Sequence, residues 1–432
     1  MKYRYNHKSH TKQKYVFKVF TVLFILFCVR RFSPINKGMY MLNNFEKYPF
    51  EKLSALLKDI TPSQDYKPIT LTIGEPQFDT PKNILDELTR NVELLNKYPK
   101  SGGEDFLKDS QLFFIANRYN LTLQRECIIP TFGTREVLFN FPQFYLYGKN
   151  NPTIAYPNPF YQIYEGAARA SRAKTVLMEL NVANNFKPTL TKEQLKEVDL
   201  VILNSPNNPT GATLSLQELQ DWVQKALEYD FVVLSDECYS EIYTDSKPAS
   251  ILEASYECGN RDFKNVLALN SISKRSSAPG LRSGFVAGDK EILQGYGLYR
   301  TYVGCAIPLP LQKASALAWR DFENPNLSRA IYAKNLEIAK TLFPNANISP
   351  YTFYVWLSVS ENVGNVGDDM RFTQFLYRTQ NIKVLPGSFL GRNGAGNGFV
   401  RLALVYESAV IKEVLERVKK ALDIFKHNGE SQ

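Results

Sequence analysis

Short apolar runs, separated by longer stretches of mixed character, divide the middle of the chain. Four of these runs end in polar or turn residues; they span residues 153–156, 200–203, 231–234 and 266–270. Runs of this length are typical of buried strands. The segments between them read as helices; Ser215 and Glu218, for example, predict a capping box before a helix that reaches about Tyr229. Strands that alternate with helices predict an α/β fold, with a mostly parallel central sheet and helices on both faces.

The two flanks of this region have a different pattern. Residues 43–60 read as an arm and a helix, and the run that begins at Leu71 is expected to end a strand at the turn of Gly74. From about residue 303 the pattern favours long helices and one strand pair, near 352–358 and 399–405. We therefore predict an arm (41–72), a large domain (73–302), a smaller α+β domain (303–426) and a tail (427–432).

The net charge of +9 belongs to the first forty residues. Nine of the 52 basic residues and none of the acidic ones lie there, which leaves 43 basic residues to balance 43 acidic ones in the rest of the chain. The excess of basic residues is therefore confined to an N-terminal tail, and it gives no reason to expect a nucleic-acid partner.

The tail contains an apolar run at residues 19–29, which is interrupted by Thr21. A membrane-spanning helix needs about twenty apolar residues. A cleaved secretory signal fits poorly, because no small-residue cleavage site follows the run. Two interpretations stay open: translation begins at Met39 or Met41, or the run is a short membrane anchor.

The positions of the cysteines and histidines limit which residues can form disulfides, bind a metal or act as acids and bases. The five cysteines are scattered without a Cys-x-x-Cys pair, which indicates a reducing compartment, and we expect a cytoplasmic protein without a metal site. The three histidines, His7, His10 and His427, all lie near the termini. Acid–base chemistry in the body must then use Lys, Asp, Glu or Tyr.

One lysine stands where such chemistry is expected. Ser271-Ile-Ser-Lys274 directly follows an apolar run, and Arg282 follows after a Pro-Gly turn. Open α/β sheets bind ligands at the carboxyl edge of their strands, so the amine and the guanidinium should face one crevice. A lysine forms a Schiff base with an aldehyde, while arginine and hydroxyl groups hold a phosphate. This set suits a phosphorylated aldehyde cofactor.

The pattern Ser-x-Ser-Lys-x5-Gly-x-Arg-x-Gly at residues 271–284 resembles the lysine signature of the class I/II aminotransferases. These are fold-type I enzymes that depend on pyridoxal 5'-phosphate (PLP), and the likeness covers about residues 41–426. The resemblance implies that Lys274 carries PLP and moves the substrate proton, and that Ser271 and Arg282 bind the phosphate.

Further phosphate contacts are expected from two other segments. Gly133-Thr134 precedes a helical run, where backbone amides at a helix start form an anion site. Tyr98, within Tyr-x4-Gly, matches a family tyrosine that reaches the partner's cofactor across a homodimer interface; the alternative is a buried core tyrosine.

The cofactor ring has its own set of expected contacts. By resemblance, Tyr161 rather than Phe160 stacks on the ring. Asn208, in Asn-Pro-Thr-Gly, donates a hydrogen bond to the phenolate oxygen, and Tyr239 shares that oxygen. Asp236 keeps the pyridine nitrogen protonated, which makes the ring an electron sink. With Lys274, these make Asp236 and Tyr239 the expected catalytic residues.

The substrate is expected to contact Gly74, Asn208 and Arg401. Arg401 lies in an apolar strand, where an unpaired charge is costly, and the family uses this arginine to bind the α-carboxylate. The alternative is a structural salt bridge. For Arg135 two roles stay open: it reaches the substrate, or it pairs with Glu136.

The sequence around Gly133 is similar to that of bacterial succinyldiaminopimelate aminotransferases, which use glutamate as amino-group donor. The resemblance implies transfer between glutamate and N-succinyl-2-amino-6-oxopimelate in lysine/diaminopimelate biosynthesis. An aspartate or aromatic aminotransferase would share the same core. A PLP-dependent carbon–sulfur lyase would share Lys274 and Arg401.

Overall fold

The computed structural model describes residues 45–359 and 368–429. The chain divides after Lys47 into two compact units. The elements described here belong to the second unit, Tyr48–Gln432. The expectations for residues 1–40 lie outside the described residues. Among the residues that are described, no helix is long and apolar enough to cross a membrane.

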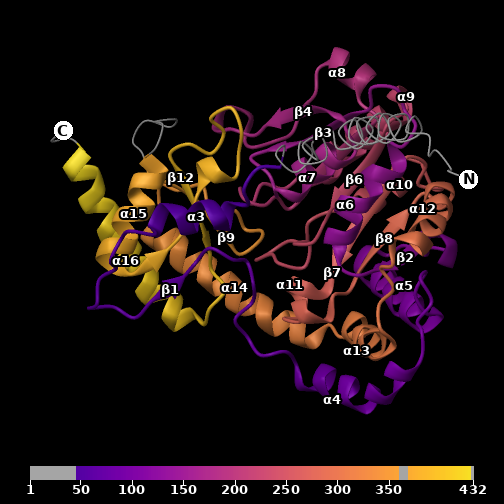
Figure 1. Cartoon of the computed structure of the whole chain (residues 1–432), viewed down its shortest axis with the longest axis horizontal. Helices are drawn as coiled ribbons and strands as arrows, with labels where there is room; N and C mark the ends of the chain where they lie inside the picture. Colours follow the sequence, from indigo (N-terminus) through magenta and orange to yellow (C-terminus); the bar gives the residue numbers. More distant parts are fainter. Residues whose placement is uncertain (1–44, 360–367, 430–432) are drawn as a thin grey trace, which may run out of the picture. The chain divides into compact units, whose positions relative to one another are not determined.

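The centre of the fold is a seven-stranded sheet (Figure 1). Its order is β2-β8-β7-β6-β5-β3-β4, and β8 is the strand that runs antiparallel to its neighbours β7 and β2. The strands are β2 (Ile128–Thr131), β3 (Thr153–Asn158), β4 (Lys174–Glu179), β5 (Leu200–Asn204), β6 (Val232–Asp236), β7 (Val266–Ser271) and β8 (Gly284–Gly288). The four predicted runs are β3, β5, β6 and β7, which confirms the mostly parallel α/β sheet.

Helices cover both faces of this sheet, because successive strand residues point to opposite sides. Leu203 and Val233 face one core, which α5 (Asp105–Tyr119), α9 (Leu216–Tyr229), α10 (Ile251–Glu257) and α13 (Leu309–Arg320) complete. Ile202 and Val232 face the other, which α6 (Thr134–Tyr145), α7 (Ile163–Ala170) and α12 (Lys290–Val303) complete. The strands are therefore buried on both faces, and this explains their continuous apolar runs.

The capping box before α9 is as predicted. The Ser215 side chain accepts from the backbone N–H of Glu218, and the Glu218 carboxylate accepts from the backbone N–H of Ser215. The remaining helices of this part are α4 (Lys82–Arg90), α8 (Lys192–Glu197) and the short α11 (Ile272–Arg275), which begins where β7 ends.

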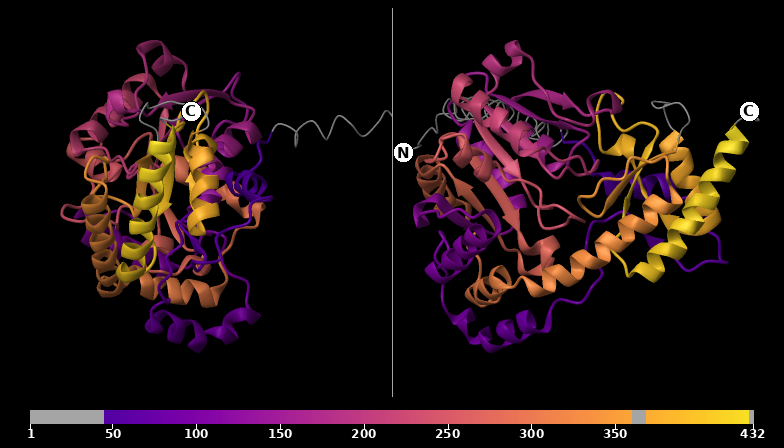
Figure 2. Two further views of the ribbon diagram at one scale, coloured as in Figure 1. Left: turned by 90° about the vertical axis from the view of Figure 1, so that its left-hand side faces the viewer. Right: turned by 180° about the vertical axis from the view of Figure 1, so that it is seen from behind.

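A second core surrounds a three-stranded sheet of order β11-β12-β9. It contains β9 (Tyr354–Ser358), β11 (Leu385–Pro386) and β12 (Phe399–Ala403). β9 and β12 are the strand pair predicted near residues 352–358 and 399–405; they run antiparallel, with Arg401 opposite Trp356. The helices of this part are α3 (Pro49–Leu57), α14 (Glu323–Leu342), α15 (Asp368–Gln380) and α16 (Ser408–Gly429). Figure 2 shows α14 running from the large sheet toward the small one.

The strand expected to end at Gly74 lies earlier in the chain. β1 spans only Ile69–Thr70, where it pairs in parallel with β10 (Ile382–Lys383). The backbone N–H of Leu71 still donates to the Lys383 oxygen, and the Leu71 oxygen accepts from the backbone N–H of Ala403. The apolar run at 71–73 therefore continues past the ladder, and it leads the chain toward the site. The division of the chain at residue 303 stays a prediction.

Candidate active site

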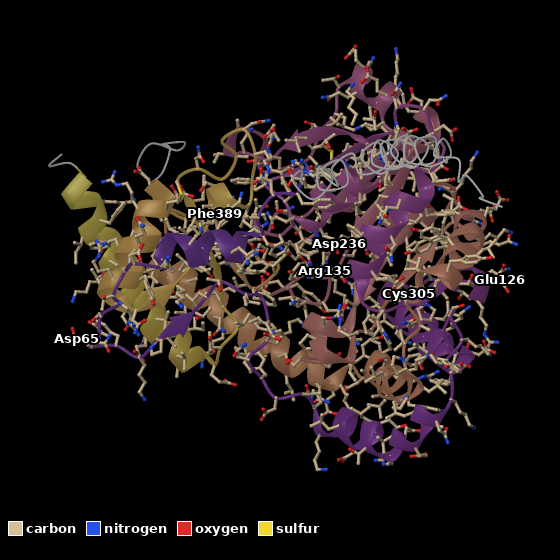
Figure 3. All side chains as sticks on the ribbon, in the orientation of Figure 1. Asp65, Glu126, Arg135, Asp236, Cys305 and Phe389 are labelled. Carbon is tan, nitrogen blue, oxygen red and sulfur yellow. The ribbon has the colours of Figure 1, made fainter. Side chains whose placement is uncertain are left out.

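A cavity of about 970 Å³ lies between the two sheets, and residues from both sheets line it. Figure 3 places Asp236 and Arg135 near the centre of the view, away from peripheral residues such as Asp65 and Glu126. Most of the site residues expected from the sequence line this cavity; they are Gly74, Thr134, Tyr161, Asn208, Asp236, Tyr239, Ser271, Lys274, Arg282 and Arg401.

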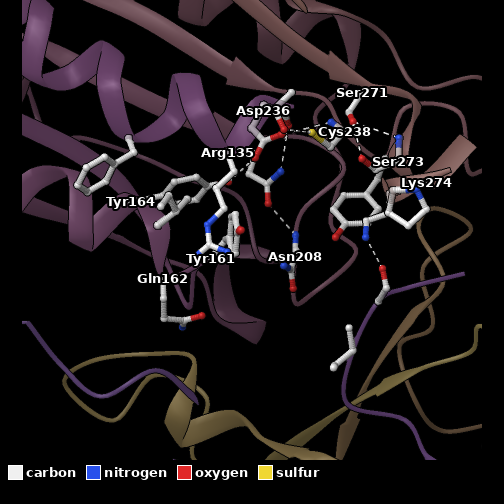
Figure 4. Close-up of a pocket in the computed structure, with 18 of the residues that line it drawn as sticks. Arg135, Tyr161, Gln162, Tyr164, Asn208, Asp236, Cys238, Ser271, Ser273 and Lys274 are labelled. Atoms are coloured by element: carbon white, nitrogen blue, oxygen red, sulfur yellow. Dashed lines mark hydrogen bonds between the residues drawn. The ribbon is translucent and has the colours of Figure 1, made fainter. Parts of the chain in front are cut away.

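Three of these side chains come from the carboxyl ends of neighbouring strands. Asp236 is the last residue of β6, Ser271 is the last residue of β7, and Lys274 follows in α11 (Figure 4). Because the strands are parallel, their carboxyl ends meet at one edge of the sheet. The crevice inferred for Lys274 is therefore formed by this edge.

Lys274 is a partly buried lysine. Its Nζ donates to the backbone oxygen of Gly74, which belongs to the segment that follows β1. Burial lowers the pKa of Lys274, and the nearby Tyr354 opposes this effect. A lowered pKa increases the fraction of neutral amine, which is the form that attacks a carbonyl or accepts a proton.

Asp236 is a buried carboxylate without a cationic partner among the described residues. Its oxygens accept from the Tyr164 hydroxyl at 2.8 Å and from the Cys238 backbone N–H at 3.3 Å. Burial raises its pKa, although these hydrogen bonds oppose the rise. A ligand cation beside this carboxylate would therefore provide the charge partner that the described protein residues do not. The protonated nitrogen of PLP's pyridine ring is a group of this kind.

Arg401 is a buried guanidinium that does not use all of its N–H donors in contacts with the described residues. Nη1 donates to Asn208 Oδ1 at 2.7 Å, Nη2 donates to the Thr72 backbone oxygen, and Nε has no partner among the described residues. Its Cζ lies 4.3 Å from the centre of the Tyr354 ring. The ion pairs of the described residues do not include Arg401, so these residues give no support to the alternative of a structural salt bridge. A carboxylate ligand could accept from Nε and from the second N–H of an Nη atom.

Arg282 and Gly133 lie against each other at the start of α6. Gly133 has φ +77°, and a Cβ there would lie 2.4 Å from the Arg282 Nη2. The glycine thus allows the guanidinium to approach the first turn of the helix. Thr134, the next residue, places its hydroxyl 3.0 Å from the Cys238 Sγ. An arginine beside a helix N-terminus forms a site for an anion such as phosphate.

Gly74 is more than an ordinary turn residue. A Cβ at this position would lie 1.9 Å from the Tyr354 hydroxyl. The Tyr354 hydroxyl also lies 3.1 Å from the Tyr239 hydroxyl. Burial raises the pKa of Tyr239 well above its ordinary value. The close approach of the Gly74 backbone therefore depends on the absence of a side chain.

Two predictions about aromatic residues have clear outcomes. Tyr161 lines the cavity, whereas Phe160 is fully buried in the core beneath it. Tyr98 is fully exposed and lies outside the cavity, so the alternative of a buried core tyrosine is wrong. Its predicted contact with a partner subunit involves a second chain and stays a prediction.

The proposed pair of Arg135 with Glu136 does not form. The Glu136 carboxylate accepts from Arg300 Nε at 2.7 Å and from the Phe132 backbone N–H at 2.7 Å. Neighbouring residues on a helix point in different directions, which explains why the adjacent arginine is not the partner. Arg135 lines the cavity instead, with its Cζ 5.6 Å from the centre of the Tyr48 ring.

Sequence reasoning missed several lining residues. Tyr164, which lies in α7, donates a hydrogen bond to Asp236, and Tyr354, which lies in β9, packs on Arg401. Ser273 belongs to the lysine motif, but no role was assigned to it; its hydroxyl accepts from the Ser271 hydroxyl at 2.9 Å. Tyr161 lies just before α7, and the centre of its ring is 5.8 Å from that of the Tyr164 ring.

Comparison with known proteins agrees with this geometry. The sequence profile of the family "Aminotransferase class I and II" matches residues 66–418. A crystal structure of aminotransferase AspB from Helicobacter pylori 26695 is 51% identical with a TM-score of 0.85, and the match covers 88% of this chain and 99% of that one.

Two curated relatives are each 28% identical. The LL-diaminopimelate aminotransferase of Aquifex aeolicus matches over 81% of this chain and 90% of its own length. The aspartate aminotransferase of Pyrococcus horikoshii matches over 82% of this chain and 90% of its own length.

Proposed function

Because this chain belongs to the class I and II aminotransferases, and is therefore a PLP-dependent transaminase, we propose that it transfers the amino group of glutamate to N-succinyl-2-amino-6-oxopimelate, in lysine/diaminopimelate biosynthesis. The observation that carries the assignment of roles is the meeting of three groups in one cavity. These are the partly buried amine of Lys274, the carboxylate of Asp236 and the Nε of Arg401; among the described residues, the carboxylate has no cationic partner and the Nε has no hydrogen-bond partner.

The residues present fit PLP. In this proposal Arg282, Gly133, Thr134 and Ser271 hold the phosphate, since a guanidinium, a helix start and a hydroxyl are all donors to an anion.

The same proposal places contacts around the ring. Asp236 receives the pyridine nitrogen, Asn208 and Tyr239 donate to the phenolate oxygen, and Tyr161 stacks on the ring face. When bound, PLP supplies an electron sink that makes the α-proton of an amino acid acidic.

The chain's own residues then bind the substrate and move its proton. Arg401 binds the α-carboxylate with two parallel hydrogen bonds, and the backbone at Gly74, which lines the same cavity, contacts the same group. Lys274 Nζ takes the α-proton and returns it, because its burial favours the neutral amine. One amine thus serves as both cofactor anchor and general base.

The choice of acceptor is supported by two observations. The cavity volume is near the upper end of the range of about 300–1,000 Å³ that is usual for small-molecule sites, so it can hold an acceptor longer than oxaloacetate beside the cofactor. In addition, a relative that matches most of the chain is named for diaminopimelate. The alternative acceptors are those of an aspartate or aromatic aminotransferase, and a relative of similar identity is named for aspartate. A carbon–sulfur lyase is a further alternative from the sequence.

A homodimer is part of the proposal. Tyr98 is fully exposed, and Leu85, Val92 and Leu95 on the same segment also expose large apolar surface. Apolar side chains gathered in this way favour contact with another protein surface. We propose that this segment packs on a second copy and that Tyr98 reaches the partner's phosphate site. The scattered cysteines support action in a reducing compartment, which we take to be the cytoplasm.

The test is a comparison of acceptors with glutamate as donor. Production of 2-oxoglutarate is measured for N-succinyl-2-amino-6-oxopimelate, oxaloacetate and phenylpyruvate. We expect the succinylated acceptor to give the highest kcat/KM. If oxaloacetate or phenylpyruvate is better by tenfold or more, the corresponding alternative replaces the proposal. Release of pyruvate and ammonia from cysteine or cystathionine would instead indicate the lyase.

A further inference from the structure

The cavity has an excess of positive charge. Among its described lining residues, the cationic ones are Arg135, Lys274, Arg282 and Arg401, and the acidic ones are Glu136 and Asp236. Glu136 is already neutralised by the ion pair with Arg300. The cavity therefore suits a set of ligands with several negative groups.

The proposed function uses all but one of these cations. Lys274 is the cofactor anchor, Arg282 contacts the phosphate and Arg401 contacts the α-carboxylate. Arg135 is left without an anionic partner. None of the ion pairs found among the described residues includes it, and its neighbour Glu136 is bound elsewhere.

Arg135 is held by aromatic contact rather than by an acid. It is the second residue of α6, and its guanidinium packs over the ring of Tyr48, which directly precedes α3. Figure 4 shows the guanidinium beside Tyr161 on the side of the cavity opposite Lys274. Stacking on a ring positions a guanidinium while leaving its N–H donors free.

We propose that Arg135 binds the distal carboxylate of a dicarboxylic amino acid and of its 2-oxo counterpart, and so determines the preference for acidic side chains. The inference rests on the proposed function, because it takes Arg401 as the site of the α-carboxylate. A planar guanidinium can bind a carboxylate through two parallel hydrogen bonds. Arg135 lies in α6, which packs on the large sheet, and Arg401 lies in β12 of the small sheet. The two arginines would bind the two ends of one substrate.

The test uses Arg135→Gln and Arg135→Lys in the holoenzyme, with Arg261→Gln as a matched control. Arg261 is also exposed, has its Cζ 5.3 Å from the centre of a tyrosine ring (Tyr256), and lies outside the cavity. Calorimetry measures the Kd of glutarate, which has two carboxylates and no amino group, and of butyrate, which has one. Half-reactions with glutamate and glutamine measure the same preference during turnover.

We expect Arg135→Gln to raise the Kd of glutarate about tenfold, which corresponds to about 1.4 kcal/mol. The ratio of kcat/KM for glutamate to that for glutamine should fall by a similar factor. Arg135→Lys should recover part of both effects, since it keeps the charge but loses the planar fork. Arg261→Gln should change neither.

Two results would overturn the inference: an unchanged glutarate Kd in Arg135→Gln, or an equal loss for glutarate and butyrate. A wild-type enzyme that transaminates but prefers glutamine to glutamate would also overturn it. Failure of the proposed function looks different. In that case the succinylated acceptor is poor for the wild type, while the effect of Arg135 on dicarboxylates is still measurable.

Discussion

Removal of the Arg401 guanidinium should weaken the binding of every amino-acid donor to the same extent. The side chain is buried, its Nη atoms donate to Asn208 and Thr72, and its Nε is free to bind a ligand. In Arg401→Ala, the α-carboxylate loses a charge-assisted, two-bond contact. We expect a loss of about 2–4 kcal/mol, which is about 30- to 1,000-fold in affinity.

The assay is the half-reaction of the holoenzyme with glutamate, aspartate, alanine and phenylalanine, followed through the cofactor's absorbance. The factor should be similar for all four donors, because the α-carboxylate is their common group. Arg401→Lys should lie between the wild type and Arg401→Ala, since it keeps the charge without the planar fork.

The substitution also affects stability, so a matched control is needed. Arg401→Ala leaves the oxygens of Asn208 and Thr72 without their donors, which should cost about 1–3 kcal/mol of unfolding free energy. Arg417 resembles Arg401: it is buried, its Nε has no partner among the described residues, and its Cζ lies 4.3 Å from the centre of the Tyr66 ring. Arg417 lies outside the cavity, so Arg417→Ala should lower stability without changing donor affinity.

The reasoning fails if glutamate binds Arg401→Ala with unchanged affinity. It also fails if the loss is confined to donors with one kind of side chain, because that pattern would place the side chain, and not the α-carboxylate, at Arg401.

Lys274→Ala should abolish turnover, and borohydride reduction followed by peptide mapping of the wild type should find the cofactor on Lys274; label on another lysine would refute the assignment. Loading of PLP onto the apoenzyme should accelerate with pH and reach half its maximum below pH 10.5, because burial lowers the pKa of Lys274 from that value; a midpoint at or above 10.5 would contradict this. Asp236→Asn should bind PLP yet slow proton transfer about a hundredfold or more. It should also raise the Tm of the apoenzyme, since a buried acid with a raised pKa opposes folding when the pH is above that pKa; native single-turnover rates, or a lowered Tm, would refute the role. A chain that begins at Met41 should be soluble, dimeric and active, since the described lining residues and every site residue predicted from the sequence lie beyond that point; a fully active monomer in sedimentation would refute the role of Tyr98.

Local sequence could predict the part of the site that is attached to strand ends. Asp236 and Ser271 each close a continuous apolar run, and a polar residue in that position must lie at the edge of a buried sheet. Gly133 could be placed as well, because a glycine before a helical run indicates a helix start. In these cases the residues that define the position are neighbours in the chain.

The missed contacts join residues that are far apart in the chain. Tyr164 and Asp236 are separated by 72 positions, and Tyr239 and Tyr354 by 115. Tyr164 and Tyr354, the two that were missed, lie in α7 and β9, whose apolar pattern explains their burial without any reference to a ligand. Their hydroxyl contacts depend on where α7 and β9 lie relative to the end of β6, which periodicity does not encode.

Asn208 shows how the two parts of the site constrain each other. Arginine has only donors, so the contact with Arg401 Nη1 requires the amide oxygen of Asn208 to face the guanidinium. The amide nitrogen then points away from Arg401, and it is free to donate toward an anionic oxygen of the cofactor. Aspartate would keep the first contact but could not donate, and leucine would lose both. The proposed roles of Asn208 toward cofactor and substrate therefore require an amide, and Arg401 fixes its orientation.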